Sequence, residues 1–244
     1  MAQFRIAHLY PSLMNLYGDR GNLITLQKRL QWYGHECIVE PVNLGCQIDY
    51  KSFDMVFMGG GSDREQGLVC LELLRQADNL WKELENDLPA LFICGAYQLL
   101  GSYYESADGK QLKGLAFFKL YTLSEPERLT GNVVIASRLN QEITTVVGFE
   151  NHAGRTYLDD ESLQPFGTVL AGFGNNGQDG QEGIQYKNVI GTYLHGPLLP
   201  KNPQVADFFI KAMANRKGLE IKGPLNDLLE DYAHQQIKRK TLGG

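Results

Sequence analysis

The sequence lacks the features that mark several large classes of protein. Its 244 residues carry a formal net charge of −5, and the one concentrated basic run is "IKRK" at 237–240. The chain therefore has no cluster of cations with which to grip a nucleic acid. No stretch approaches the roughly 18 apolar residues of a membrane-spanning helix, and the N-terminus has no apolar core behind a basic head. We expect a cytoplasmic protein that does not bind nucleic acid.

Cysteine is also scarce, and its spacing gives no sign of a metal site. The four cysteines form no CxxC pair, and no two histidines stand at metal-ligand spacing. A chain of this length buries roughly 70–75% of its unfolded surface, so it needs no disulfides. We expect reduced thiols and no metal, and we interpret Cys37, Cys46 and Cys70 as structural.

The pattern of apolar residues predicts an α/β fold. The first hundred residues alternate between strands and helices, which predicts a mainly parallel sheet flanked by helices. The strands are expected over 4–10, 36–42, 53–58 and 89–94, and the helices over 21–33, 64–77, 79–87 and directly after Cys94.

The second half of the chain predicts a smaller antiparallel part. Short strands are expected over 117–123, 132–137, 143–149, 168–173, 183–186 and 188–194, followed by helices over 203–217 and 224–238. The Gly-rich stretch 172–183 is typical of a mobile loop. No linker divides the halves, so we expect one domain over 1–244, with a helical tail at about 224–240 that is a candidate partner contact.

One cysteine stands where chemistry is favoured. In "LFICGAYQLLG" (91–101), Cys94 ends a buried strand and begins a helix. Ligands bind beyond the carboxyl ends of parallel strands, and helix N-terminal amides favour a thiolate. The N–H of Gly95 is placed to hold a developing oxyanion. The alternative is a small buried cysteine of the core, and this segment alone does not separate the two.

A nucleophilic thiol needs a base, and two of the five histidines follow strands. His195 in "NVIGTYLHGP" ends a β-rich run, like Cys94, and is the preferred base. His152 in "GFENHAGRT" is the second candidate. We expect His8 in the core, His35 in a surface turn and His234 on a solvated helix.

The glycines of "MGGGSDRE" (58–65) follow the third strand but match no nucleotide-binding motif. The stretch lacks both GxxxxGK[ST] and GxGxxG with its downstream acid. Glycines here let the backbone approach a ligand closely, so an N–H of this loop is a candidate second oxyanion donor. A simple tight turn is the alternative.

Five stretches, in order along nearly the whole chain, resemble class I glutamine amidotransferases of the kind found in cobyric acid synthases. They are "MNLYGDRGN" (14–22), "GGGSDREQ" (59–66), "FICGAYQLLG" (92–101), "GFENHAGRT" (148–156) and "GTYLHGPLL" (191–199). The resemblance implies a flavodoxin-like or Rossmann-like α/β fold. It also implies that Cys94 is the nucleophile and His195 the base and acid.

The resemblance implies further roles within the site. Gly60 and Gly95 are expected to donate to the oxyanion, and Gln98 matches the pocket glutamine of the family. The sequence departs from the family where Phe92 and Ala96 replace the glycines that usually flank the nucleophile.

A second departure concerns the residue that orients the histidine. Pro197 stands where many members carry a glutamate two residues after it, so the local motif predicts a Cys–His dyad. We therefore hypothesise that an acidic residue of a partner orients His195.

The α-carboxylate of glutamine calls for a planar bidentate cation, which favours arginine. Arg64, Arg128 and Arg155 all neighbour the matched stretches, and Arg128 in "PERLTGN" is the preferred candidate. The alternative for Arg128 is a surface arginine at the head of a strand. The alternative for Arg155 is a structural role in the turn "HAGRT".

The free-standing length, with "GGGSDREQ", "RLTGN" and "HGPLLPKN", resembles glutaminase subunits that work with a Mur-ligase-like synthetase. That resemblance implies a heterodimer whose partner binds ATP and Mg²⁺, while this chain carries no cofactor. It implies ammonia transfer to the α-carboxyl of D-glutamate in lipid II, at the inner face of the membrane. Cobyrinic acid is an alternative acceptor. A DJ-1-like or peptidase-like protein with a cysteine at the same turn is an alternative class.

Overall fold

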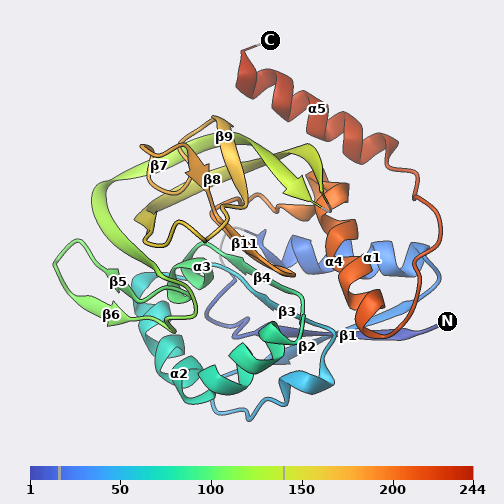
Figure 1. The fold of residues 1–244 in the computed structure, drawn as a ribbon, viewed down its shortest axis with the longest axis horizontal. Coiled ribbons are helices and arrows are strands. Elements are labelled where there is room, and N and C mark those ends of the chain that lie inside the picture. The colour runs from blue at the N-terminus through green and yellow to red at the C-terminus, as the bar shows by residue number, and fades with distance from the viewer. Residues whose placement is uncertain (16–17, 140, 244) are drawn as a thin grey trace.

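A computed structural model describes residues 1–15, 18–139 and 141–243, so residues 16 and 17 of the matched stretch 14–22 lie outside the described residues. Its centre is a six-stranded sheet in the order β11-β12-β4-β3-β1-β2 (Figure 1). All neighbouring strands are parallel except the edge pair β11–β12. The strands are β1 (Gln3–Leu9), β2 (Glu36–Val42), β3 (Met55–Met58), β4 (Ala90–Ile93), β11 (Ile184–Tyr186) and β12 (Val189–Thr192).

The middle strands of this sheet are covered on both faces. Every residue of β3, β4 and β12 is buried, which is the pattern of a parallel sheet packed between helices.

The helices are α1 (Arg20–Trp32), α2 (Asp63–Glu85), the short α3 (Gly95–Leu99) and α4 (Pro203–Arg216), with single 3₁₀ turns at Tyr50–Ser52 and Leu199–Lys201. The predicted helices 64–77 and 79–87 are one continuous helix, α2.

A second sheet packs above the first and is dominated by one long hairpin (Figure 1). The strands β7 (Leu120–Leu139) and β8 (Glu142–Leu158) pair antiparallel, with a register shift between Ser124 and Leu129. The rest of this sheet is β5 (Tyr103–Glu105), β6 (Gln111–Lys113), β9 (Gly167–Ala171) and β10 (Gln181–Glu182). The predicted strands 117–123 and 132–137 thus fall on one strand, and the β5–β6 hairpin lies where no strand is predicted.

The glycine-rich stretch 172–183 was expected to be mobile, but the structure anchors it. Asn175 is fully buried and its side chain bonds Gly183 at both the N–H and the C=O. The N–H groups of Phe173 and Gly174 donate to the buried carboxylate of Glu150 at 2.8 and 2.9 Å. These buried hydrogen bonds fix the segment to the second sheet, which is not the arrangement of a mobile loop.

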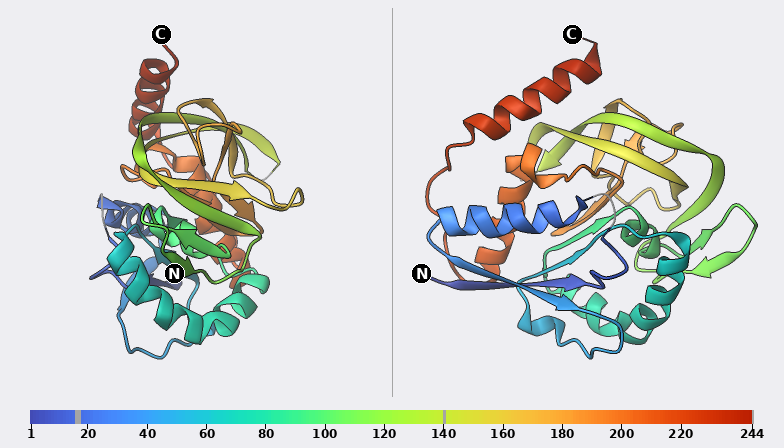
Figure 2. Two further views of the ribbon diagram at one scale, coloured as in Figure 1. Left: turned by 90° about the vertical axis from the view of Figure 1, so that its left-hand side faces the viewer. Right: turned by 180° about the vertical axis from the view of Figure 1, so that it is seen from behind.

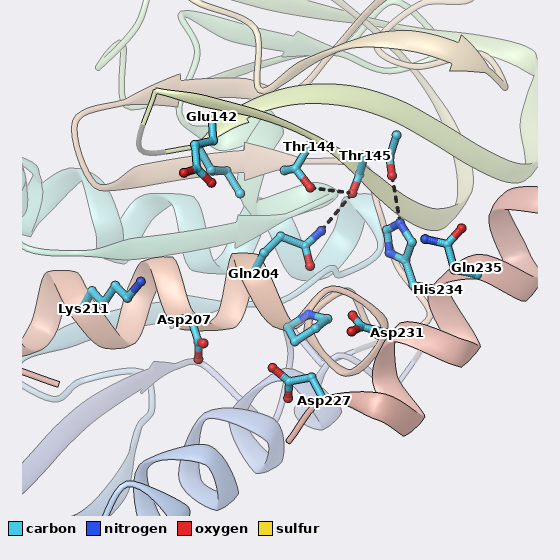
Figure 3. A pocket seen from close by; sticks show the side chains of 12 residues that line it. Glu142, Thr144, Thr145, Gln204, Asp207, Lys211, Asp227, Asp231, His234 and Gln235 are labelled. Atoms are coloured by element: carbon cyan, nitrogen blue, oxygen red, sulfur yellow. Dashed lines mark hydrogen bonds between the residues drawn. The ribbon is translucent and has the colours of Figure 1, made fainter. Parts of the chain in front are cut away.

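The C-terminal helix α5 (Leu228–Leu242) extends away from the body of the molecule (Figure 2). Its inner face borders a cavity of about 390 Å³ between α4 and the tip of the β7–β8 hairpin (Figure 3). His234 bonds Thr145 Oγ1 and the Lys201 carbonyl, each at 2.9 Å. The prediction of a solvated His234 is therefore wrong, because this residue is the buried anchor of α5. Among the described residues, no helix has the length and apolarity needed to cross a bilayer.

Candidate active site

Cys94 sits at a strained turn between β4 and α3. Its backbone has φ 52° and ψ −108°, a conformation that costs of order 1–3 kcal/mol for a residue other than glycine. Its N–H donates to the Thr192 carbonyl of β12 at 2.8 Å and its carbonyl accepts from Gln98, which hold the turn on both sides. A turn of this kind projects a nucleophile clear of its own backbone. Phe92 and Ala96, which replace the usual glycines, are both accommodated as buried residues.

The neighbouring strand brings His195 to the same place. β12 runs parallel to β4, with Thr192 opposite Ile93. His195 then exchanges two backbone hydrogen bonds with Phe149 of β8. A Cβ atom added to Gly60 would lie 3.3 Å from Cys94 Cβ and 3.4 Å from His195 Cε1. Three residues far apart in the sequence therefore meet at the carboxyl ends of β3, β4 and β12.

The charge balance around His195 suits a thiolate–imidazolium pair. Burial lowers the pKa of His195, but the charge of Cys94 and hydrogen bonds to Asp19 and Cys94 raise it to about 10. Burial raises the pKa of the Cys37 thiol to about 12 and that of Cys70 to about 11. Those two thiols are therefore poor nucleophiles at neutral pH.

The carboxylate beside His195 comes from this chain. Asp19 is fully buried directly before α1, and its Oδ1 lies 3.1 Å from His195 Nδ1. A carboxylate only accepts, so Nδ1–H donates to Asp19 and Nε2 is the nitrogen left to serve Cys94. The local motif predicts a dyad whose orienting acid comes from a partner, but the acid that occupies His195 Nδ1 belongs to this chain. This acid lies 176 residues away in sequence, outside the local motif.

The glycine loop makes a contact that the sequence did not predict. The Gly60 N–H donates to Asp19 Oδ2 at 3.0 Å, so it is engaged, contrary to its expected role as oxyanion donor. Gly61 follows it and lines the cavity beside Cys94. Among the described residues, no hydrogen bond uses the N–H of Gly61 or of Gly95. These two amides are the better candidates for the oxyanion site.

A cavity of about 350 Å³ opens beside Cys94 and has the size of a small polar ligand. Gln98 lines it and donates to Tyr193 Oη at 3.1 Å. Arg128 lies on its exposed side, where its Nε and Nη2 donate to the Oδ1 and carbonyl of Asn151 at 2.7 and 2.6 Å. The lining also includes Gly61, Ser62, Asp63, Arg64, Gln66, Tyr104, His152, Ala153 and Gly154.

The remaining candidates divide clearly. Arg64 lines the cavity with Arg128, whereas Arg155 is buried and donates to the carbonyls of Ala153 and Glu127. Arg155 therefore supports the backbone around the cavity. His152 also lines the cavity, but its ring stacks on Tyr193 with centroids 3.6 Å apart and its Nδ1 bonds the Gly154 carbonyl. This side chain shapes the wall, and His195 is the histidine beside the thiol.

Sequence reasoning missed two residues of the site. Asp19 lies inside the matched stretch 14–22, but nothing in its spacing linked it to His195. Tyr193 forms hydrogen bonds with Gln98 and Thr156, and its ring stacks on His152. Its position between the buried strand β12 and His195, only two residues before the histidine, was the available signal.

Comparison with known proteins agrees with this geometry. Residues 5–203 match the CobB/CobQ-like glutamine amidotransferase domain, so the chain belongs to that family. The chain is 44% identical to the lipid II isoglutaminyl synthase (glutamine-hydrolyzing) subunit GatD of Staphylococcus aureus, over 98% of this chain and 100% of the relative. It is 39% identical to the protein of the same name in Streptococcus pneumoniae, over 96% of this chain and 89% of the relative.

The fold is shared more widely than the sequence. The structure of PurLQS from Thermotoga maritima aligns with a TM-score of 0.61 at 14% identity, covering 88% of this chain and 99% of that one. At this identity the likeness shows the fold alone. It agrees with the α/β architecture expected for a class I glutamine amidotransferase.

Proposed function

We propose that this chain is the glutamine-hydrolysing subunit of an amidotransferase. The observation that carries the proposal is the strained Cys94 turn beside His195, at the mouth of a cavity that also holds Gln98 and Arg128. Membership of the CobB/CobQ-like family supports the same chemistry. It also favours glutamine hydrolysis over the redox or peptidase roles of other proteins with a cysteine at such a turn.

The proposed reaction has two halves. The Cys94 thiolate attacks the side-chain amide carbon of glutamine, and the N–H groups of Gly61 and Gly95 hold the tetrahedral oxyanion. The His195 imidazolium gives its proton to the leaving nitrogen, so ammonia departs and a thioester forms. His195 then takes a proton from water as the water attacks the thioester. Glutamate leaves, and the thiolate–imidazolium pair is restored.

The cavity suits the two ends of the substrate. Arg128 offers a planar guanidinium for the α-carboxylate, and the hydrogen bonds that it donates to Asn151 fix its orientation. The buried Gln98 stands beside the nucleophile with its amide oriented by Tyr193. Each half of the molecule supplies part of this lining, which supports one functional domain over 1–244.

The proposed acceptor is the α-carboxyl of D-glutamate in lipid II, on a Mur-ligase-like partner that activates it with ATP and Mg²⁺. The names of the two relatives above support this choice. Such a heterodimer acts in peptidoglycan synthesis, in the cytoplasm at the inner face of the membrane. This chain supplies un-ionised ammonia, and the carbon–nitrogen bond forms on the partner.

The test begins with glutamine. Wild-type protein, alone and with its co-purified partner, is assayed for release of ammonia and glutamate, and is labelled with a glutamine-derived chloroketone. We expect labelling at Cys94, and loss of both signals in Cys94→Ala. The matched control is Cys46→Ser, because Cys46 is exposed and lies outside the cavity. Turnover that survives in Cys94→Ala contradicts the proposal.

The acceptor is tested with the complex. Lipid II, ATP, Mg²⁺ and glutamine are incubated with it, and the stem peptide is analysed by mass spectrometry. We expect conversion of D-glutamate to D-isoglutamine. Unchanged lipid II together with amidation of cobyrinic acid assigns the other acceptor.

A further inference from the structure

We propose that Asp19 is the positioning residue of this site: its carboxylate holds both the catalytic histidine and the glycine loop in place. This inference rests on the proposed function. The two carboxylate oxygens of Asp19 have different partners. Oδ1 accepts from His195 Nδ1 at 3.1 Å, and Oδ2 accepts from the Gly60 N–H at 3.0 Å. One buried group thus sets both the imidazole that moves the proton and the loop that precedes Gly61.

The placement of Asp19 is tightly determined by its surroundings. A Cβ atom on Gly59 would lie 3.1 Å from Asp19 Oδ2 and 2.8 Å from the Met14 carbonyl. The glycine at 59 is therefore what leaves room for the carboxylate. Since Asp19 is fully buried, water does not compete for its oxygens, and each hydrogen bond is stronger than at a surface.

The first turn of α1 is fastened to the segment that follows His195. A Cβ atom on Gly21 would lie 2.4 Å from Pro197 Cγ, so helix and segment are in close contact. One residue further, Asn22 Oδ1 accepts from the Leu199 N–H at 2.8 Å. Pro197, which stands where many family members place an acid, therefore serves as the packing contact that brings Asp19 to the histidine.

The chemical consequence follows from hydrogen bonding at the imidazole. Nδ1–H donates to Asp19, which fixes the tautomer and leaves Nε2 for Cys94 and the leaving nitrogen. The negative charge also stabilises the imidazolium that forms when the thiol ionises. Among the residues that the structure describes, the charged or titratable groups that face His195 are Asp19 before α1, Cys94 after β4 and the buried Glu182 of β10.

The test is Asp19→Asn, whose amide keeps the shape but loses the charge and can turn an N–H toward His195. We expect kcat for glutamine to fall at least about 100-fold with little change in KM, by analogy with other catalytic triads. The basic limb of the kcat/KM profile, on which the imidazolium loses its proton, moves to lower pH. The matched control is Asp54→Asn, a buried aspartate that accepts the Arg5 N–H at the other end of the sheet.

A structural role alone would lower the yield or melting temperature of Asp19→Asn and leave the pH profile of the folded fraction unchanged. A folded Asp19→Asn with the kcat and basic limb of the wild type overturns the proposal. Should this variant not fold, Gly21→Ala decides, because its methyl pushes α1 from Pro197 while both partners remain. We expect a lower kcat and the same shift in that variant, and wild-type values overturn the proposal.

Failure of the proposed function is recognised separately. If the wild type neither hydrolyses glutamine nor takes the chloroketone, the amidotransferase reaction is wrong. The role of Asp19 is then measured by the rate of Cys94 alkylation with iodoacetamide against pH, which requires only the thiol and its histidine. We expect Asp19→Asn to shift this profile to higher pH. Without the carboxylate the His195 imidazolium is less stable, so it stabilises the thiolate less. An unshifted profile overturns the inference.

Discussion

Cys94 has a strained backbone conformation, and this strain is tied to its role as nucleophile. A positive φ is unfavourable for cysteine, yet the bonds from Cys94 to Thr192 and Gln98 hold it. Cys70, in the regular helix α2, shows the ordinary setting of a core cysteine: it is buried, and its Sγ–H donates to the Lys113 carbonyl. The two cysteines therefore differ by backbone conformation rather than by residue type.

Arg128 gives the residue-scale prediction. Its guanidinium is oriented by two hydrogen bonds that it donates to Asn151 at the side of the cavity. It is therefore placed to bind a carboxylate in the ground state and in the transition state alike. We expect Arg128→Ala to raise KM for glutamine roughly 10–100-fold, the range for a lost charge-assisted hydrogen bond. The effect on kcat is smaller, because uniform binding is lost. Steady-state kinetics measure both values.

Arg138→Ala is the control for this change, since Arg138 lies on the same strand but is exposed and outside the cavity. An unchanged KM in Arg128→Ala would remove Arg128 from substrate binding. Arg64, which lines the same cavity, would then be the arginine to replace next.

At the scale of elements, α1 is the member that ties the molecule together. Its N-terminal turn holds Asp19, and its later turns hold the buried Arg29. Arg29 donates to Asp207 of α4 and to Asp227 at the start of α5. A single helix thus links the active site to both C-terminal helices.

Arg29→Met tests this link. The change leaves two carboxylates without their cation, so we expect the free energy of unfolding to fall by about 2–4 kcal/mol. The lower part of that range is favoured because each aspartate side chain remains 19% exposed. Urea denaturation measures the change.

Arg5→Met breaks the more exposed Arg5–Glu40 pair and serves as the control, with an expected loss well below that of Arg29→Met because solvent screens the pair. Equal losses in the two variants would show that burial of Arg29 contributes nothing.

Sequence patterns predicted local elements well and their joining poorly. The strands of the parallel sheet and the turn at Cys94 were readable because apolar runs and a following glycine mark them locally. The merging of two predicted strands into β7 was not readable, because the polar run "SEPERLTGN" resembles a loop. In the structure it stays extended, and the pairing with β8 shifts register between Ser124 and Leu129. Asp19 was not predicted as a site residue for a similar reason. Its partner is chosen by the packing of Gly21 on Pro197, a contact between distant segments that no local spacing records.

At the scale of the whole molecule, the site is a seam between two sheets. Cys94 and the glycine loop come from the parallel sheet, and Arg128, His152 and Gly154 come from the β7–β8 hairpin. Behind this seam lies the buried Glu182, which accepts from Thr192 Oγ1 and the Tyr193 N–H at 2.9 and 2.6 Å. Burial raises its pKa to about 8, so the protonated form is the one that the fold favours.

The free energy of unfolding is expected to depend on pH through Glu182. Between about pH 4.3 and pH 8 the folded state holds the Glu182 proton while the unfolded state has released it. The stabilisation is therefore complete below this window and is lost as pH rises through it, at up to ~1.4 kcal/mol per pH unit.

Glu182→Gln stays neutral at every pH, so we expect it to gain stability relative to the wild type as pH rises from 5 to 8. Urea denaturation at each pH measures the difference, in which contributions from other groups cancel. Glu142→Gln, an exposed change, is the control. Parallel pH curves for wild type and Glu182→Gln would contradict a protonated Glu182.

The central claim is that Cys94, with His195 as its proton carrier, forms a thioester with glutamine. The most direct measurement mixes enzyme and glutamine for milliseconds, quenches in acid and locates the glutamyl adduct by mass spectrometry of peptides. The account predicts the adduct on Cys94, absent in Cys94→Ala and slowed in formation in His195→Asn. Ammonia release at the wild-type rate with no adduct on Cys94, or an adduct on another residue, would contradict it.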